Sequence, residues 1–454
     1  MPGRELAAVI LGSALITLDG TAATVALPAI AQGLEVPFSQ LQWISNAPLL
    51  ALAALLLPAG GLADTHGRGR LVRIGLITFS AASLGCALAP SALVLIGGRF
   101  LQGAAGALVL PAALARLRAA YSNAEERTRK FGVWAAWTGV AGATGPLLGG
   151  ALVDLVSWRA VFVLSSGVAA AAVILLGAAS DREQVTQRRA VPVREATALA
   201  LLLGAAAYLL IEGRTAGWTS VRVLIATLLI PVSVTIVVQG RGRGALFPRE
   251  LIARRNCMAG NAATFALYFG VFGLPFLLVL YTQQALGYSG TWAGAAVLPI
   301  SLMLFLAEPF GRMTARVGTR GIIAAGSIVA SAGIAWVAAG AHPLPFWTRL
   351  IPGTALFGLG VSMAVSPLTH AAVAAVPEAS AGAASGLNHA TVRAAGLLAI
   401  ALLGSLAGGT DAGGITAEGF RSALFICSVI VGAGGLAGGI RIRDEEPGGL
   451  PADS

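Results

Sequence analysis

Long, continuous apolar runs make up most of the chain, and short connectors with turn residues and charges separate them. A helix that crosses a bilayer needs about 20 apolar residues, whereas the strands of a membrane β-barrel alternate apolar and polar positions over about ten. Because the runs are continuous, they predict an all-α integral membrane protein. We predict fourteen spans, over residues 5–32, 38–64, 71–90, 92–115, 131–153, 158–180, 195–212, 220–239, 257–284, 290–312, 321–341, 347–375, 382–407 and 420–440.

The composition excludes a soluble protein. Of the 454 residues, 56% are hydrophobic and 11% are charged, against about 25% charged residues in an average soluble domain. The first run is too long for the core of a signal peptide, which predicts a retained first span. Three widely separated cysteines indicate neither a disulfide framework nor a metal site. Without a phosphate-binding loop motif or a metal-ligand cluster, we expect no cofactor.

The net charge of +10 is concentrated in alternate connectors rather than spread along the chain. If the tail that carries Arg4 is cytoplasmic, 23 of the 30 Lys and Arg residues lie inside, five lie outside and two, Arg99 and Arg393, lie within spans. This asymmetry predicts fourteen spans with both termini cytoplasmic, and it makes nucleic acid an unlikely partner. Four acidic residues fall at the outer ends of spans, where we expect water to solvate them: Asp154, Glu212, Asp411 and Glu418.

An internal sequence repeat divides the chain. The connector Gly60–Gly67 follows the second span, and a similar connector, Gly311–Gly318, follows the tenth span 251 residues later. Two parallel six-helix halves with two spans inserted between them fit this register. We therefore predict an N-terminal six-helix bundle over residues 1–180, a linker plus two inserted spans over 181–255, and a C-terminal six-helix bundle with a short tail over 256–454.

Several short motifs give the chain a family resemblance. They are Leu18-Asp19-Gly20-Thr21, the stretch Gly60 to Arg70, Arg99 to Gly103, the glycines around Gly145-Pro146, and Gly382 to Arg393. In this order they resemble the major facilitator superfamily, and specifically its 14-span drug:proton antiporter branch. The resemblance implies the major facilitator fold and a proton-coupled antiporter that exports lipophilic or cationic small molecules, such as drugs and antibiotics, by alternating access. It implies protons, a small-molecule substrate and the lipid bilayer as partners, and we expect a monomer in the cell membrane.

Ionisable residues within spans are candidates for proton coupling because they are costly to place in lipid. Asp19 and Arg99 are expected at similar depths, roughly 21 and 26 Å from the inner end of the bundle. When Arg99 is close, it would favour the charged carboxylate of Asp19, and when the two separate, Asp19 could take up a proton. The alternative is a permanent structural ion pair between the two residues. Glu308 is either a second proton site or an interfacial partner of Arg312, and Arg393 needs an acceptor, for which Glu308 is one candidate.

The remaining candidates concern conformational change and cargo. Asp64 and Gly67 resemble the superfamily's loop latch, which Thr65, Gly69 and Ala315 weaken here because they replace residues that the family usually places there. The small residues of the fifth span should let spans from opposite halves approach closely, as hinge and seal: Gly142, Gly145, Pro146, Gly149 and Gly150. The candidate substrate cavity has six residues, although its aromatic members could instead face lipid: Gln102, Trp134, Trp137, Phe265, Tyr268 and Asn388.

Two other functions compete with drug export. The first is a dedicated transporter of a single metabolite or lipid. The second is a membrane-embedded enzyme or receptor, which we do not expect because the sequence contains no Ser/His/Asp, HExxH or paired-carboxylate constellation and no long extramembrane loop. We therefore expect no catalytic residues. The two inserted spans should pack outside the twelve-helix core, with Tyr208 and Glu212 away from the transport path.

Overall fold

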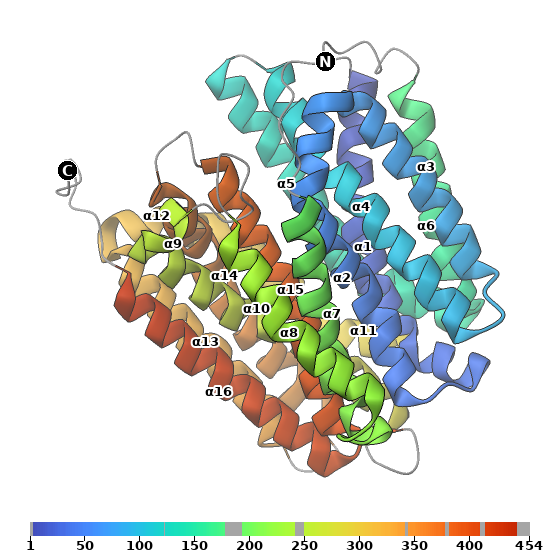
Figure 1. Cartoon of the computed structure of the whole chain (residues 1–454). Coiled ribbons are helices and arrows are strands. Elements are labelled where there is room, and N and C mark those ends of the chain that lie inside the picture. The colour runs from blue at the N-terminus through green and yellow to red at the C-terminus, as the bar shows by residue number, and fades with distance from the viewer. Residues whose placement is uncertain are drawn as a thin grey trace.

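Helices account for nearly all of the described chain, as Figure 1 shows. The structure, a computed structural model, describes residues 3–121, 123–177, 193–240, 249–340, 344–376, 381–408 and 414–442. Twelve of its described helices are long and apolar enough to cross a membrane. This confirms the prediction of an all-helical membrane protein. Helices α2 and α5, of 29 and 32 residues, are not among the twelve.

The N-terminal set consists of six helices, whose connectors end each apolar run with a turn or a cap. Asn123 caps α5 because its side chain accepts hydrogen bonds from the N–H groups of Glu125 and Glu126. The helices of this set are α1 (Gly3–Leu34), α2 (Phe38–His66), α3 (Arg68–Ala87), α4 (Ala92–Ala120), α5 (Ala124–Leu155) and α6 (Trp158–Leu176).

Two inserted helices follow, α7 (Val193–Ala216) and α8 (Val221–Gln239), and then a C-terminal set. Ser289 and Thr416 cap α11 and α16 with their side-chain oxygens. This part of the chain contains α9 (Arg249–Ala253), α10 (Arg255–Gln284), α11 (Gly290–Met303), the 3₁₀ turn η2 (Leu304–Leu306), α12 (Ala307–Val317), α13 (Thr319–Ala338), the π turn η3 (Phe346–Leu350), α14 (Ile351–Ala374), α15 (Ala381–Ala407) and α16 (Ala417–Arg441).

The two sets repeat one packing pattern. In the N-terminal set, α1 packs against α5 and α6, α4 against α2 and α3, and α3 against α6. In the C-terminal set, α10 packs against α15 and α16, α14 against α11 and α13, and α13 against α16. Each helix thus has a counterpart with equivalent neighbours, as expected of a duplicated unit. The sets meet where α5 packs on α11, α2 on α15, and α1 on α10 and α11.

Figure 1 shows the inserted helices α7 and α8 at the front of the assembly, where the two sets adjoin. Helix α7 packs against α2 and α15, one helix from each set, and α8 packs mainly against α7. Only 17% of the most apolar part of α8 is buried, the lowest share among the candidate spans. Glu212 of α7 accepts a hydrogen bond from Nε1 of Trp43 at 3.1 Å. It therefore contacts α2, which corrects the expectation that it is merely solvated.

The internal repeat is also present in the backbone conformation of the two connectors. Gly67, between α2 and α3, has φ +89°, and Gly318, between α12 and α13, has φ +85°. Residues with a side chain rarely adopt this conformation, so glycine is required at both turns. The predicted span 290–312 differs from its counterpart, because the 3₁₀ turn η2 interrupts it between α11 and α12.

We predict that Gly67→Ala destabilises the protein by about 1–2 kcal/mol, because alanine is strained at a positive φ. The thermal unfolding midpoint of the purified protein in detergent should fall. Gly60→Ala is the matched control: neither position has a heavy atom within 4 Å of an added Cβ, but only Gly67 has a positive φ. Equal midpoints for the two variants would contradict the prediction.

Candidate functional site

A buried ion pair joins α1 and α4. Nη1 of Arg99 donates to Oδ2 of Asp19 at 2.5 Å, and each residue is 3% exposed. Nε of Arg99 also donates to the carbonyl of Ile44 on α2, and its guanidinium lies 5.7 Å from the ring centre of Phe162. The structure therefore brings together the two residues for which the sequence predicted similar depths.

Asp19 accepts two further hydrogen bonds. Oγ of Ser165 donates to its Oδ1 at 2.8 Å, and Nε2 of Gln102 donates to the same oxygen at 3.1 Å. Nε2 of Gln102 also donates to Ser83, and its Oε1 accepts from Arg99 at 2.8 Å. Side chains of α4 and α6 thus bind the carboxylate of α1, and Gln102 links this network to α3.

Gln102 was predicted to line a substrate cavity, and the structure corrects this. Gln102 is 1% exposed and belongs to the Asp19 network. The reason is helical spacing: Gln102 follows Arg99 by three residues and so shares its face. The sequence analysis missed Ser165, which gave no signal because a serine within a span is unremarkable until its neighbour is known. It also missed Asn46, whose buried side-chain amide has no hydrogen-bond partner among the described residues.

The small residues of α5 contact two different neighbouring helices. A Cβ added at Gly145 or Gly149 would meet Thr21 or Ala22 of α1, and one at Gly142 would lie 3.3 Å from Thr17, also of α1. The carbonyl of Gly142 also accepts a hydrogen bond from Oγ of Ser301 on α11 at 3.4 Å, so the predicted contact with the opposite half is present at Gly142. At Gly145 and Gly149 the added Cβ meets the N-terminal set instead, which corrects the prediction for these two glycines. All three glycines face α1 because they repeat at intervals of three or four residues along one side of α5.

Two other residues of α5 do meet the C-terminal set. A Cβ added at Gly150 would overlap the backbone of Gly290, and one added at Gly294 would overlap the backbone of Pro146. Helices α5 and α11 are thus in backbone contact at these two levels. For Gly150 and Pro146, the expected close approach of opposite halves is present.

Hydrogen bonds join the two sets at the same end, where α1, α5 and α10 end and α2 and α11 begin. We call it the closed end. Gln42 of α2 donates to the carbonyls of Ile400 and Ala401 of α15, each at 2.9 Å. Gln283 of α10 donates to the carbonyl of Val25 of α1 at 3.0 Å. Side chains from α2 and α10 therefore reinforce the backbone contact.

Asp154 caps a helix of the opposite set at the closed end. Its Oδ1 accepts from the N–H of Gly290 at 2.8 Å, and its Oδ2 accepts from the N–H and the hydroxyl of Thr291 at 2.8 and 2.6 Å. Burial raises the pKa of Asp154, but these hydrogen bonds outweigh that effect and hold the pKa below its usual value. Asp154 is exposed, as expected of a residue that water reaches, but it also has a partner that the sequence analysis did not anticipate. The N-terminus of α11 offers it unpaired N–H groups and a positive dipole end.

We predict that Asp154→Asn loosens the closed end. The neutral amide loses the interaction with the helix dipole, so the population separated at this end should rise about fivefold. Spin labels on the exposed residues Val156 and Trp292 would measure the separation, and the three native cysteines are buried. Because the pKa of Asp154 is lowered, its contribution is complete above the ordinary aspartate pKa and is lost as the pH falls through the lowered value. Identical distance distributions in both proteins would contradict the prediction.

The predicted aromatic residues lie on two helices of different sets. Trp137 of α5 is 57% exposed, and Nε1 of the half-buried Trp134 has no hydrogen-bond partner among the described residues. On α10, Phe265 lies 6.2 Å from Phe269 and Tyr268 lies 6.5 Å from Phe272, measured between ring centres. No ring contact between the two groups is present among the described aromatic side chains.

Asn388 was predicted to line the cavity and instead lies between helices. It is 5% exposed, and its Nδ2 donates to Asn261 and Thr264 of α10, both at 3.3 Å. This corrects the prediction, since the amide satisfies polar groups between α15 and α10.

The last predicted candidates lie toward the other end of the bundle. The side chain of Glu308 is 84% exposed and lies 3.8 Å from Arg312, one helical turn away. This is the interfacial pairing that the spacing allowed. No ion pair between Glu308 and Arg393 is present among the described residues. Asp64 lies in the last turn of α2, and its side chain is outside the described part of the structure. Gly67 forms the turn that follows.

Comparison with known proteins assigns the chain to a family. The model of the Major Facilitator Superfamily matches residues 9–401. The chain belongs to this superfamily. It is therefore a multi-pass protein of the cell membrane with a transporter fold. The superfamily model begins before Asp19 and ends after Arg393, so it contains every predicted site residue.

Two relatives of this superfamily member are named as resistance proteins. It is 31% identical to the multidrug resistance protein Stp of Mycobacterium tuberculosis (strain CDC 1551 / Oshkosh), over 87% of this chain and 74% of that protein. It is also 31% identical to the puromycin resistance protein pur8 of Streptomyces alboniger, over 94% of this chain and 86% of that protein.

Solved structures of other transporters share the fold of this superfamily member. The peptide transporter POT in complex with sulfate has a TM-score of 0.71 at 16% identity, with 95% of this chain and 93% of that chain covered. A bacterial homologue of the human lysosomal transporter Spinster, in an inward-facing and unoccupied conformation, has a TM-score of 0.66 at 16% identity, with 97% and 98% covered. At this identity the likeness concerns the fold alone.

Proposed function

We propose that the protein is a proton-coupled antiporter that exports lipophilic or cationic small molecules by alternating access. The observation that carries the proposal is the buried Asp19 network, in which one carboxylate is shared by an arginine and a glutamine of α4 and a serine of α6. Ionisable groups at this depth are retained where they serve a function. The names of the resistance relatives support drugs or antibiotics as cargo.

In this proposal Asp19 carries the proton and Arg99 controls when it binds. With α1 and α4 together, Arg99 and Ser165 favour the charged carboxylate. A movement that separates the two helices would leave the carboxylate to take up a proton. Cargo binding that drives this movement would exchange one cargo molecule for protons, and Glu308 remains a proposed second proton site in the vestibule.

The proposed cargo path opens at the end opposite to the closed end. In support, Trp137 of α5 and Phe305 of η2 are 57% and 50% exposed, although α5 meets the C-terminal set and Phe305 would lie 3.8 Å from a Cβ added at Gly139 of α5. Trp134, Phe265 and Tyr268 would supply the aromatic surface that flat, lipophilic cations favour. Asp64 and Gly67 would form the latch at this open end, and Asp154 would stabilise closure at the other.

We further propose fourteen spans, with α2 and α5 added to the twelve candidates, and both termini in the cytoplasm. Helices α2 and α5 have 29 and 32 residues, which exceeds the length that a bilayer requires, and both pack against candidate spans. The repeated packing pattern supports bundles at 1–180 and 256–454 with the inserted pair between them. We also propose a monomer, because a transport path between the two sets of one chain would not need a second copy.

A second candidate is an exporter dedicated to one compound. The relative from Streptomyces alboniger is named for puromycin alone, which supports a narrow cargo range. The two candidates share the proton mechanism and differ in the number of compounds exported.

The deciding experiment measures transport in inverted membrane vesicles that contain the protein. Addition of a proton gradient should drive accumulation of lipophilic cationic dyes, and a protonophore should stop it. Susceptibility of producing cells to a panel of antibiotics would then separate broad from narrow export. Transport that continues after the gradient is collapsed would refute proton coupling, and a panel without any change in susceptibility would refute drug export.

A further inference from the structure

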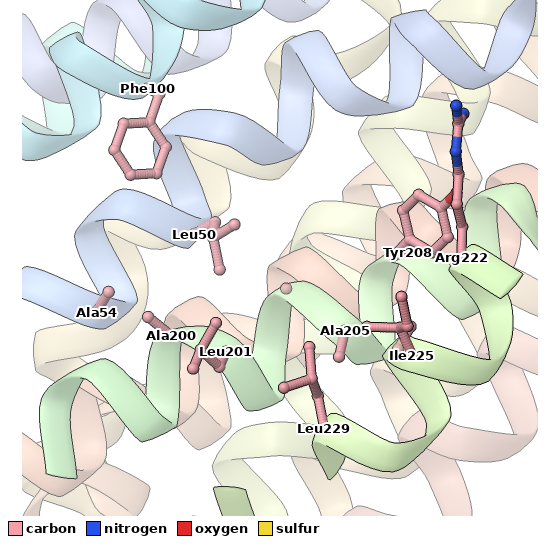
Figure 2. Close-up of a pocket in the computed structure, with 12 residues that line it drawn as sticks. Leu50, Ala54, Phe100, Ala200, Leu201, Ala205, Tyr208, Arg222, Ile225 and Leu229 are labelled. Atoms are coloured by element: carbon pink, nitrogen blue, oxygen red, sulfur yellow. The ribbon is translucent and has the colours of Figure 1, made fainter. Parts of the chain in front are cut away.

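A groove of about 470 Å³ runs along the outside of the bundle, between α2 and α4 on one side and α7 and α8 on the other (Figure 2). Its walls are open to the surroundings, since Phe100, Leu201 and Ile225 are 42%, 44% and 53% exposed. The groove is lined by Leu50, Ala54, Phe100, Ala200, Leu201, Gly204, Ala205, Tyr208, Arg222, Ile225, Ala226 and Leu229.

Small residues explain why the space is not filled. Gly103 brings α4 into backbone contact with α2 at Pro48, so these helices form a single wall. The facing surface of α7 consists largely of Ala200, Gly204 and Ala205, which leave room above the helix. A Cβ added at Gly204 would lie 3.6 Å from Leu50. A larger side chain there would therefore occupy the groove.

The groove has an apolar body and one polar end. Figure 2 shows Arg222 and Tyr208 together at one end, with Ala200 and Leu229 toward the other. Along α7, Ala200 and Tyr208 are eight residues apart, which corresponds to roughly 12 Å. Arg222 lies in the first turn of α8, at the closed end of the bundle, and is the one charged residue among those that line the groove.

The nearest carboxylate on α7 is directed elsewhere. Glu212 accepts a hydrogen bond from Trp43, whose ring centre lies 6.4 Å from that of Tyr208. Glu212 does not line the groove. The groove therefore offers a cation at one end and hydrocarbon along the rest, which complements an amphiphile with a negative head and an apolar tail.

We propose that this groove binds an anionic phospholipid from the bilayer, with one acyl chain along α7 and the phosphate at Arg222. An arginine at the membrane surface attracts acidic lipid headgroups, and the exposed apolar walls accept an acyl chain without loss of contact with the surrounding lipid. The bound lipid would join α2 and α4 of the N-terminal set to the inserted pair. The inserted helices thus have a role in lipid binding that is separate from transport chemistry.

Native mass spectrometry of the full chain tests the proposal, with dioleoylphosphatidylglycerol and dioleoylphosphatidylcholine supplied in equal amounts. The wild type should retain the anionic lipid about fivefold over the neutral one. Arg222→Gln should abolish this preference, and Arg222→Lys should keep most of it. Arg421→Gln is the matched control, an exposed arginine in the first turn of α16, which starts at the same end of the bundle.

Gly204→Phe tests the acyl-chain part, because the ring would fill the groove. This variant should lose the most tightly held lipid of either headgroup. An unchanged lipid preference in Arg222→Gln overturns the proposal even if Gly204→Phe does not fold. The lipid proposal is also overturned if the wild type retains both lipids equally and Gly204→Phe loses dye export. That result would mean that the groove binds cargo instead of lipid.

Discussion

Replacing Asp19 with asparagine should reduce gradient-driven export by about 100-fold or more, the scale on which loss of a proton-transfer group acts. Asparagine keeps the size of the side chain and can still accept from Ser165 and Gln102, but it cannot exchange a proton. Dye accumulation in inverted vesicles under an imposed proton gradient measures the effect. Dye binding to the purified protein should be largely retained, since Asp19 is 3% exposed and would not contact cargo in this state.

The charge left on Arg99 needs its own control. Removal of one partner from a buried ion pair costs about 3–5 kcal/mol, because the other charge remains without compensation. The double variant Asp19→Asn with Arg99→Gln removes both charges. It should recover the expression level and the thermal midpoint of the wild type without recovering export. Recovery of export by the double variant would show that the pair is a structural bridge.

Ser165→Ala separates hydrogen bonding from charge. It removes one donor to Oδ1 of Asp19 and leaves the Arg99 contact in place. Export should therefore fall only a few-fold, with its pH dependence displaced from that of the wild type. If the Asp19→Asn variant retained full gradient-driven export, Asp19 would have no part in the mechanism.

The fold could be predicted from sequence because lipid allows so few solutions. Continuous apolar runs can only be helices, and the positions of the charges separate one connector from the next. The repeat at Gly67 and Gly318 was visible for a related reason, because a positive φ requires glycine at both turns. The all-helical fold and the internal repeat therefore follow from composition and local rules, whereas the family was indicated by the resemblance of short motifs. The count of fourteen spans stays a prediction, since twelve described helices qualify as candidate spans.

The partners of individual side chains could not be predicted in the same way. Gln102 and Asn388 were assigned to a cavity because polar residues within spans suggest cargo, yet each satisfies polar groups between helices. Helical spacing fixes the face that a residue shares, as with Arg99 and Gln102, but not the helix that this face meets. Asp154 illustrates the same limit, since its partner lies 136 residues away.

Gly150→Ala should prevent full closure between α5 and α11 and thereby stop the transport cycle. The added methyl group would overlap the backbone of Gly290, which cannot move aside as a flexible side chain could. Overpacking of this kind costs about 1–3 kcal/mol, which corresponds to a decrease of roughly fivefold to a hundredfold in the closed population. Spin-label distances between Val156 and Trp292 should lengthen, and export should fall in proportion.

The same helix supplies a matched control and the opposite helix supplies a second test. Gly142→Ala adds the same methyl group 3.3 Å from Thr17, within the N-terminal set, and should leave the α5–α11 distance unchanged. Gly294→Ala meets the backbone of Pro146 from the other side and should reproduce the effect of Gly150→Ala. Gly145→Ala, which faces Thr21, should lower thermal stability instead. If Gly142→Ala and Gly150→Ala lengthen the distance equally, the division of α5 into an inner face against α1 and a sealing face against α11 is wrong.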